Sequence, residues 1–225
     1  MEKEKKVVEK LFRQCAERGW IKELIPSSIT LEEIEKFEKE HEVILPSFFK
    51  AFLMAYQLPC EDFEICGIAE HVDEISPLWL LLYNISSMDK LSERIKIFQE
   101  DSEELCNIKA ENCKKLILIG DWGAGWGPLC IDLAKDEALV DKEKEDTWTL
   151  VWFDHEEFDW KDYYEIDEEG WLHGSPAAPN LETLLEWYFG GSLEAEFEEE
   201  NQVKVSYERL NNYDFCSSYW EDKWK

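Results

Sequence analysis

The N-terminal part of the chain places apolar side chains at the spacing of an α-helix. Residues 3–18 carry them on one helical face, at positions 7, 8, 11, 12 and 15. Gly19 follows at the position where glycine often caps the C-terminal end of a helix. The pattern therefore predicts a first helix that ends just before Gly19.

A capping signal predicts the start of the second helix. Thr30 and Glu33 have the spacing of a capping box, in which each side chain accepts a hydrogen bond from the other residue's backbone N–H. Pro46 interrupts this helix and suits the first position of another, which we expect over residues 46–57. Two helices joined by a short link are therefore predicted.

Beyond residue 60 the chain changes to short apolar runs that are typical of strands. They occupy residues 63–68, 115–120, 128–133 and 147–153, and the last run alternates so little that we expect burial on both its faces. We also expect a helix over 87–105, a hairpin over 163–174 and a final helix that Asn180 caps and Gly190 ends. Residues 72–86 fit no pattern clearly. The order of elements indicates an α+β fold, with N-terminal helices packed on a largely antiparallel or mixed sheet and with a C-terminal helix.

Glycines cluster directly after one of these runs, at positions 120, 123, 125 and 127. A dinucleotide-binding loop needs G-x-G-x-x-G between a strand and a helix, whose N-terminus meets the pyrophosphate. Here a second strand-like run follows, no Lys-Ser/Thr pair completes a P-loop, and Asp121 and Asp132 would repel a phosphate. We therefore expect a hairpin, whose glycines allow positive φ angles and close packing beside Trp122 and Trp126.

Acidic residues dominate the charge of the chain. The 225 residues include 52 acidic and 24 basic side chains, which give a formal net charge of −28. Residues 61–225 hold 41 of the acidic and 14 of the basic side chains. Such a field repels nucleic acid and anionic membranes and attracts basic partners. Solubility alone is the alternative explanation.

No residue pattern in the chain is typical of a catalytic or metal-binding site. Seven cysteines without a C-x-x-C pair favour reduced thiols in a cytoplasmic protein over a disulfide framework or a zinc site. The four histidines are far apart, and the acidic segment 154–162 lacks the glycine and the final glutamate of an EF-hand loop. The charged N-terminus does not resemble a signal peptide, and no apolar run is long enough to span a bilayer. We expect no metal, no cofactor and no enzymatic activity.

Three segments, taken in order, resemble the SUKH superfamily, which includes bacterial immunity proteins and yeast cell-wall assembly regulators. Residues 29–53 are similar to its opening, an acidic helix that ends in Leu-Pro and continues into an aromatic helix. Residues 116–133 are similar to its strand, glycine-rich turn and strand closing on an aspartate, and residues 178–189 to its terminal helix. The resemblance covers residues 28–192. It leaves residues 1–27 as an N-terminal helical extension and 193–225 as an acidic and aromatic C-terminal extension.

The resemblance implies a binding domain without catalysis, and many bacterial members of the superfamily neutralise a cognate toxin by direct contact. The charge leads to the same expectation, because nuclease toxins have basic surfaces that an acidic inhibitor reaches quickly. We therefore expect an immunity protein of a polymorphic toxin system. The alternatives are a scaffold or regulatory module that binds a cellular partner, and a carbohydrate-binding protein or enzyme that uses tryptophan and acidic side chains. The sequence leaves the oligomeric state open.

We expect the partner to meet acidic residues and tryptophans, because interface hot spots favour tryptophan. The candidate residues are Asp121, Trp122, Trp126, Asp154, Glu156, Glu157, Asp159, Trp160 and Asp162. The alternative for Trp122 and Trp126 is that they fill the core beside the glycine turn.

Overall fold

The computed structural model describes five stretches of the chain. They are residues 1–70, 75–122, 127–154, 164–190 and 204–210, and for 66–70, 75–79 and 204–210 the backbone alone is described. The α-helices in these stretches are α1 (Glu2–Glu17), α2 (Leu31–His41), α3 (Ser47–Ala55), α4 (Met88–Cys106) and α5 (Leu181–Tyr188). The strands are β1 (Asp62–Glu70), β2 (Ile75–Tyr83), β3 (Leu116–Trp122), β4 (Gly127–Asp132), β5 (Leu150–Trp152), β6 (Tyr164–Ile166), β7 (Leu172–Ala178) and β8 (Lys204–Leu210). Short 3-10 helices are η1 (Ala110–Cys113), η2 (Glu137–Leu139) and η3 (Glu145–Thr147).

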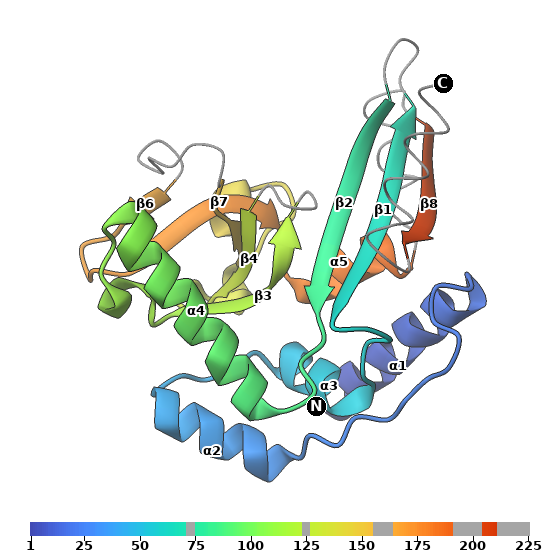
Figure 1. Ribbon diagram of the computed structural model, residues 1–225, viewed down its shortest axis with the longest axis horizontal. Coiled ribbons are helices and arrows are strands. Elements are labelled where there is room, and N and C mark those ends of the chain that lie inside the picture. Colours follow the sequence, from blue (N-terminus) through green and yellow to red (C-terminus); the bar gives the residue numbers. More distant parts are fainter. Residues whose placement is uncertain (71–74, 123–126, 155–163, 191–203, 211–225) are drawn as a thin grey trace.

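The strands form a single antiparallel sheet. Their order across it is β6-β7-β5-β4-β3-β2-β1-β8, and every neighbouring pair is antiparallel. The predicted α+β fold is therefore confirmed. The prediction allowed a largely antiparallel or a mixed sheet, and the sheet is antiparallel. β1, β2 and β8 project together from the rest of the molecule (Figure 1). β8 lies in the segment 193–225 and adds a strand to the edge of β1.

The predicted helix caps are present. The Thr30 hydroxyl accepts a hydrogen bond from the Glu33 N–H at 3.3 Å, and the Glu33 carboxylate accepts one from the Thr30 N–H at 2.8 Å, which confirms the capping box of α2. At the start of α5, Asn180 Oδ1 accepts a hydrogen bond from the Thr183 N–H at 2.9 Å. Pro46 is the N-cap of α3 and not its first helical residue, so α3 begins one position later than predicted, at Ser47. α2 already ends at His41, ahead of the link that contains Pro46.

Central strands explain why two parts of the sequence lack alternation. β2, in the unassigned stretch 72–86, pairs with β1 along its whole length and with β3 through residues 80–82. Leu150 and Val151 of β5 are adjacent, so they point to opposite faces of the sheet, and both are fully buried. The predicted burial of that run on both faces is therefore confirmed.

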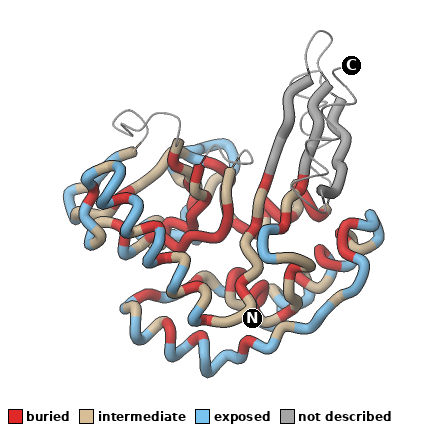
Figure 2. Tube along the Cα trace, in the orientation of Figure 1, coloured by how far each residue is buried: buried red, intermediate tan, exposed pale blue. Residues whose placement is uncertain are grey.

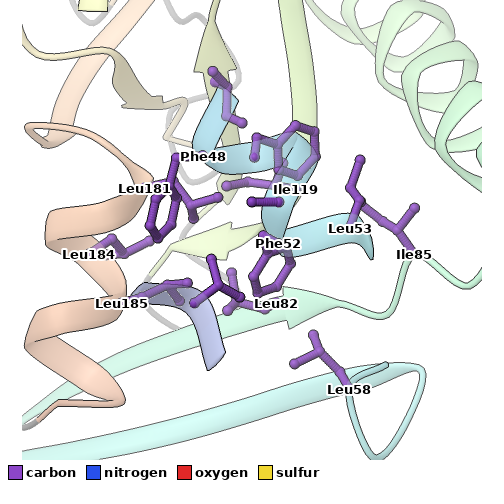
Figure 3. Close-up of a cluster of buried hydrophobic side chains, with 14 of the residues drawn as sticks. Phe48, Phe52, Leu53, Leu58, Leu82, Ile85, Ile119, Leu181, Leu184 and Leu185 are labelled. Atoms are coloured by element: carbon purple, nitrogen blue, oxygen red, sulfur yellow. The ribbon is translucent and has the colours of Figure 1, made fainter. Parts of the chain in front are cut away.

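Helices α1, α3 and α5 cover one face of the sheet. Their apolar side chains meet those of the central strands, including Phe52, Leu82, Ile119 and Leu184, in one continuous cluster (Figure 3). Phe12 of α1 is fully buried, and its ring centroid lies 5.5 Å from that of Phe189 in an edge-on contact. Residues 1–27 therefore contribute a helix to the core of the domain that the resemblance places at 28–192.

Helix α4 covers part of the other face. Phe98 packs against Phe153 with ring centroids 5.4 Å apart, and Leu116, Leu118 and Cys130 complete this second cluster. Figure 1 shows α4 in front of the sheet, crossing the start of β3, and Figure 2 shows the exposed residues on its outer side. Toward β1 and β2, this helix contributes long polar side chains. That part of the sheet face is consequently half-exposed, as the burial of its residues shows.

Candidate partner-binding site

The described part of the chain contains some of the candidate partner-binding residues. Asp121 and Trp122 are the last two residues of β3, and Asp154 follows β5. All three are half-buried. The remaining candidates lie outside the described residues; they are Trp126, Glu156, Glu157, Asp159, Trp160 and Asp162.

Asp121 and Trp122 point to opposite faces of the sheet, because they are consecutive in one strand. Trp122 pairs with Leu80 and packs at the margin of the large core cluster. Asp121 pairs with Leu81 and lies on the other face. The structure therefore separates these two candidates, and it favours the core alternative for Trp122.

Asp121 belongs to an acidic surface that spans β1, β2 and β3. Glu64, Leu81 and Asp121 are opposite one another on these strands, so their side chains share a face. Asp62 and Tyr83 form the neighbouring cross-strand pair on the same face. We call these five residues the acidic sheet face. β1 and β3 lie on either side of β2, so Glu64 and Asp121 are separated by two strand spacings, about 10 Å, and their carboxylates interact through their charges at that range.

Helix α4 supplies positive charge at one end of the acidic sheet face. The guanidinium carbon of Arg94 lies 3.8 Å from the ring centroid of Tyr83, which is a cation–π contact. Arg94 also forms ion pairs of 3.5 Å with Glu61 and with Asp62. Lys90 Nζ lies 2.8 Å from the Glu61 carboxylate. The aromatic ring and the carboxylates at this end therefore hold a guanidinium group.

Toward the middle of the face, the half-buried Glu64 feels the charges of Asp62 and Asp121. Burial raises the pKa of Glu64, and the negative charges of Asp62 and Asp121 raise it further. The pKa of Tyr83 is raised to about 12, first by burial and then by the carboxylate of Asp121, although Arg94 acts in the opposite direction. The ionised form of Glu64 is therefore disfavoured at this position, and a cation that approached it would stabilise that form.

Gly120 allows β2 and β3 to approach closely beside Asp121. A Cβ atom at this position would overlap the backbone carbonyl oxygen of Leu81. The register of β3 against β4 shifts between Leu118 and Gly120, and the strands then pair as far as Trp122 and Gly127. The hairpin predicted in place of a phosphate-binding loop is therefore confirmed, and so is close packing at Gly120.

A second polar cluster, which the sequence pattern did not predict, joins residues that are far apart in the chain. His173 Nδ1 lies 2.5 Å from Asp132 Oδ2, and His173 Nε2 lies 3.1 Å from Asp167 Oδ2. The buried Asp132 also accepts a hydrogen bond from the Ala134 N–H at 3.0 Å. Asp167 accepts one from the Trp171 N–H at 2.8 Å within the β6–β7 turn. The cluster therefore fastens this turn to the end of β4.

The protonated form of His173 is favoured in this cluster. Its pKa is raised, first by the hydrogen bond with Asp132 and also by Asp167, while burial acts in the opposite direction. The pKa of Asp167 is lowered, mainly by the Trp171 N–H and further by His173. An imidazolium that donates from both nitrogens has none left to accept a proton from a substrate. The arrangement therefore suits a structural role better than that of a general base.

Comparisons with known proteins found no match among family models, curated proteins or solved structures. Within the described stretches, no helix has both the length and the apolar character needed to cross a membrane. Among these same residues, no group of three or more His, Cys, Asp or Glu side chains is arranged to hold a metal ion. What the molecule binds is therefore inferred below from its own surfaces.

Proposed function

We propose that this chain is a non-catalytic protein-binding module. We further propose that it is a cytoplasmic immunity protein of the SUKH type, which neutralises a cognate toxin by direct contact. The observation that carries the proposal is the acidic sheet face, where neighbouring carboxylates surround Glu64 on a half-exposed surface. A toxin of the nuclease type is the proposed partner, because surfaces that bind phosphates are basic.

The charge of the whole chain supports a basic partner. Its net charge of −28 creates a field that attracts basic proteins. Complementary charge raises association rate constants from about 10⁵–10⁶ to as much as 10⁸–10⁹ M⁻¹s⁻¹ at low salt. A protein that covers the basic surface of a nuclease also keeps nucleic acid away from it. Inhibition therefore needs no chemical step.

Co-expression with the protein encoded by the adjacent reading frame tests the proposal, which expects that protein to be toxin-like. We expect the two proteins to co-purify and their association to slow as salt rises from about 0.05 M to 0.5 M, because the Debye length shrinks. Absence of a complex would refute the proposal. An association rate that does not respond to salt would refute its electrostatic part.

A pair of double variants locates the contact. Glu64→Gln with Asp121→Asn removes two charges from the acidic sheet face and retains similar side-chain volumes. We expect binding to weaken about tenfold or more, which corresponds to ~1.4 kcal/mol. Glu103→Gln with Glu104→Gln removes the same charge from exposed positions on α4 and serves as the control. Equal losses in the two variants would show that only net charge matters and that the acidic sheet face is not the contact.

A further inference from the structure

A groove separates the link that joins α2 and α3 from the segment that follows β4. Its volume is about 520 Å³. Apolar residues of both segments line it, and they are Ile44, Leu45, Pro46, Ile131, Leu133 and Ala134. Lys50, Lys135, Asp136 and Glu137 lie among them at its polar margins. The groove is separate from the acidic sheet face, whose residues do not line it.

Ile44 is the most exposed large apolar side chain in the described part of the chain, at 81% of its full accessibility. Its neighbours Val43 and Leu45 are buried, at 6% and 1%, so the link is anchored and Ile44 is turned outward. Single exposed apolar residues are ordinary on protein surfaces. Ile44 differs because it lines the groove together with the partly exposed Pro46 and Leu133, so these apolar side chains form one patch.

The charges at the groove leave its margin acidic. Lys50 is neutralised by Glu38, with Nζ 2.9 Å from the carboxylate oxygen. Lys135 Nζ donates a hydrogen bond to the backbone carbonyl of Asp146 at 3.2 Å and keeps its positive charge, which the two carboxylates of Asp136 and Glu137 outnumber. The pKa of Glu137 is raised by desolvation and then by the carboxylates of Glu182 and Asp136. A cation placed beside Glu137 would therefore relieve repulsion between carboxylates.

We propose that this groove docks a segment of a protein partner in which an apolar side chain is flanked by lysine or arginine. The apolar side chain fills the groove against Pro46 and Leu133, which line it and are partly exposed, and the cation lies beside Asp136 and Glu137. Interface hot spots have this form, with an apolar anchor in a pocket and a polar rim around it. The proposal depends on the groove and its charges, and it does not require the partner to be a toxin.

A protein segment fits these features better than a small molecule does. Sites for small ligands are concave and bury most of the ligand's surface. Here the most exposed apolar side chain, Ile44, lies at the rim of the groove. A small ligand inside the groove would leave Ile44 exposed to water. The surface of a protein covers the groove and Ile44 together.

A short synthetic peptide serves as the probe. We would titrate the ¹⁵N-labelled full chain with a blocked hexapeptide of alternating lysine and leucine, and follow the amide chemical shifts. Shifts are expected at Ile44, Leu133 and Ala134. The same peptide with serine in place of leucine is expected to bind at least about fivefold more weakly, since a hot spot is worth more than ~1 kcal/mol.

Matched variants decide whether Ile44 takes part. Ile44→Ser changes a side chain that makes little contact with the folded core, and we expect it to weaken peptide binding about fivefold. Leu105→Ser, at a position of α4 that is 56% exposed, is the control and should leave binding unchanged. Absence of binding, shifts confined to other surfaces, or equal effects of the two variants would overturn the proposal. The assay contains no toxin, so its failure would leave the proposed function standing, and a failure to bind toxin would leave this result standing.

Discussion

Replacing His173 by glutamine tests how the Asp132–His173–Asp167 cluster stabilises the fold. The side chain of Asp132 is 0% exposed, and His173 is its charged partner, at 18% exposure. Without the imidazolium, the Asp132 carboxylate stays buried with the hydrogen bond from the Ala134 N–H. Removing one partner of a buried ion pair costs about 3–5 kcal/mol, and the partial exposure of His173 places our expectation at the lower end, about 3 kcal/mol.

This stabilisation depends on pH. The pKa of His173 in the folded protein lies above its ordinary value of 6.5, so the folded state binds the proton more tightly than the unfolded state does. The contribution is therefore fully present below about pH 6.5 and is lost as pH rises through the folded pKa. The pKa of Asp167 is lowered from 3.8, so its contribution is present above that value and is lost as pH falls toward the folded pKa. Above about pH 5, Asp167 is ionised in both states, and the change with pH reports His173.

Urea denaturation at pH 6 and at pH 9 measures the effect. We expect His173→Gln to lower the free energy of unfolding by about 3 kcal/mol at pH 6 and by clearly less at pH 9. His41→Gln is a matched control, because His41 is hydrogen-bonded to the Ser92 hydroxyl at 3.0 Å and not to carboxylates. A loss below about 1 kcal/mol at pH 6, or the same loss at both pH values, would refute the account of the cluster.

Three further substitutions test the packing and the caps. Phe12→Ala should lower the free energy of unfolding by about 3–5 kcal/mol in a denaturant titration, and a loss below about 1 kcal/mol would mean that α1 is not part of the core. Gly120→Ala should cost at least about 1–3 kcal/mol, because its Cβ would overlap the Leu81 carbonyl; an unchanged melting temperature would contradict the close approach of β2 and β3. Thr30→Ala removes the cap of α2 and should cost about 1 kcal/mol, or about 2–4 °C in Tm by calorimetry, whereas no change would argue against the capping box.

Signals confined to one helical turn were sufficient to predict where α2 and α5 begin. The capping box joins Thr30 and Glu33, and the cap of α5 joins Asn180 and Thr183, each across three positions. The donor and the acceptor of each hydrogen bond therefore lie in the same short segment, and the sequence alone shows both. The strand–turn–strand order around Gly120 was predictable for the same reason, since it depends on neighbouring runs.

Contacts across the sheet were not predictable, because they depend on strand order and register. Glu64 and Asp121 share a face only because both are in register with Leu81 of β2, and a slip of one residue would turn either side chain to the other face. Asp132 and His173 are 41 positions apart and meet through the β6–β7 turn. Asp121 and Trp122 were expected to serve one site, but strand geometry assigns them to different faces.

The acidic sheet face has two competing explanations, because a half-exposed face must be polar to stay soluble. Solubility is satisfied by charges of either sign and by pairs such as Arg94 with Asp62. It does not require a carboxylate at Glu64, where burial and then the charges of Asp62 and Asp121 raise the pKa. Replacing Glu64 and Asp121 together by lysine separates the explanations. A surface that serves only solubility would keep binding its basic partner after this change. We expect the variant to remain soluble and to lose that partner, because like charges across an interface cost several kcal/mol.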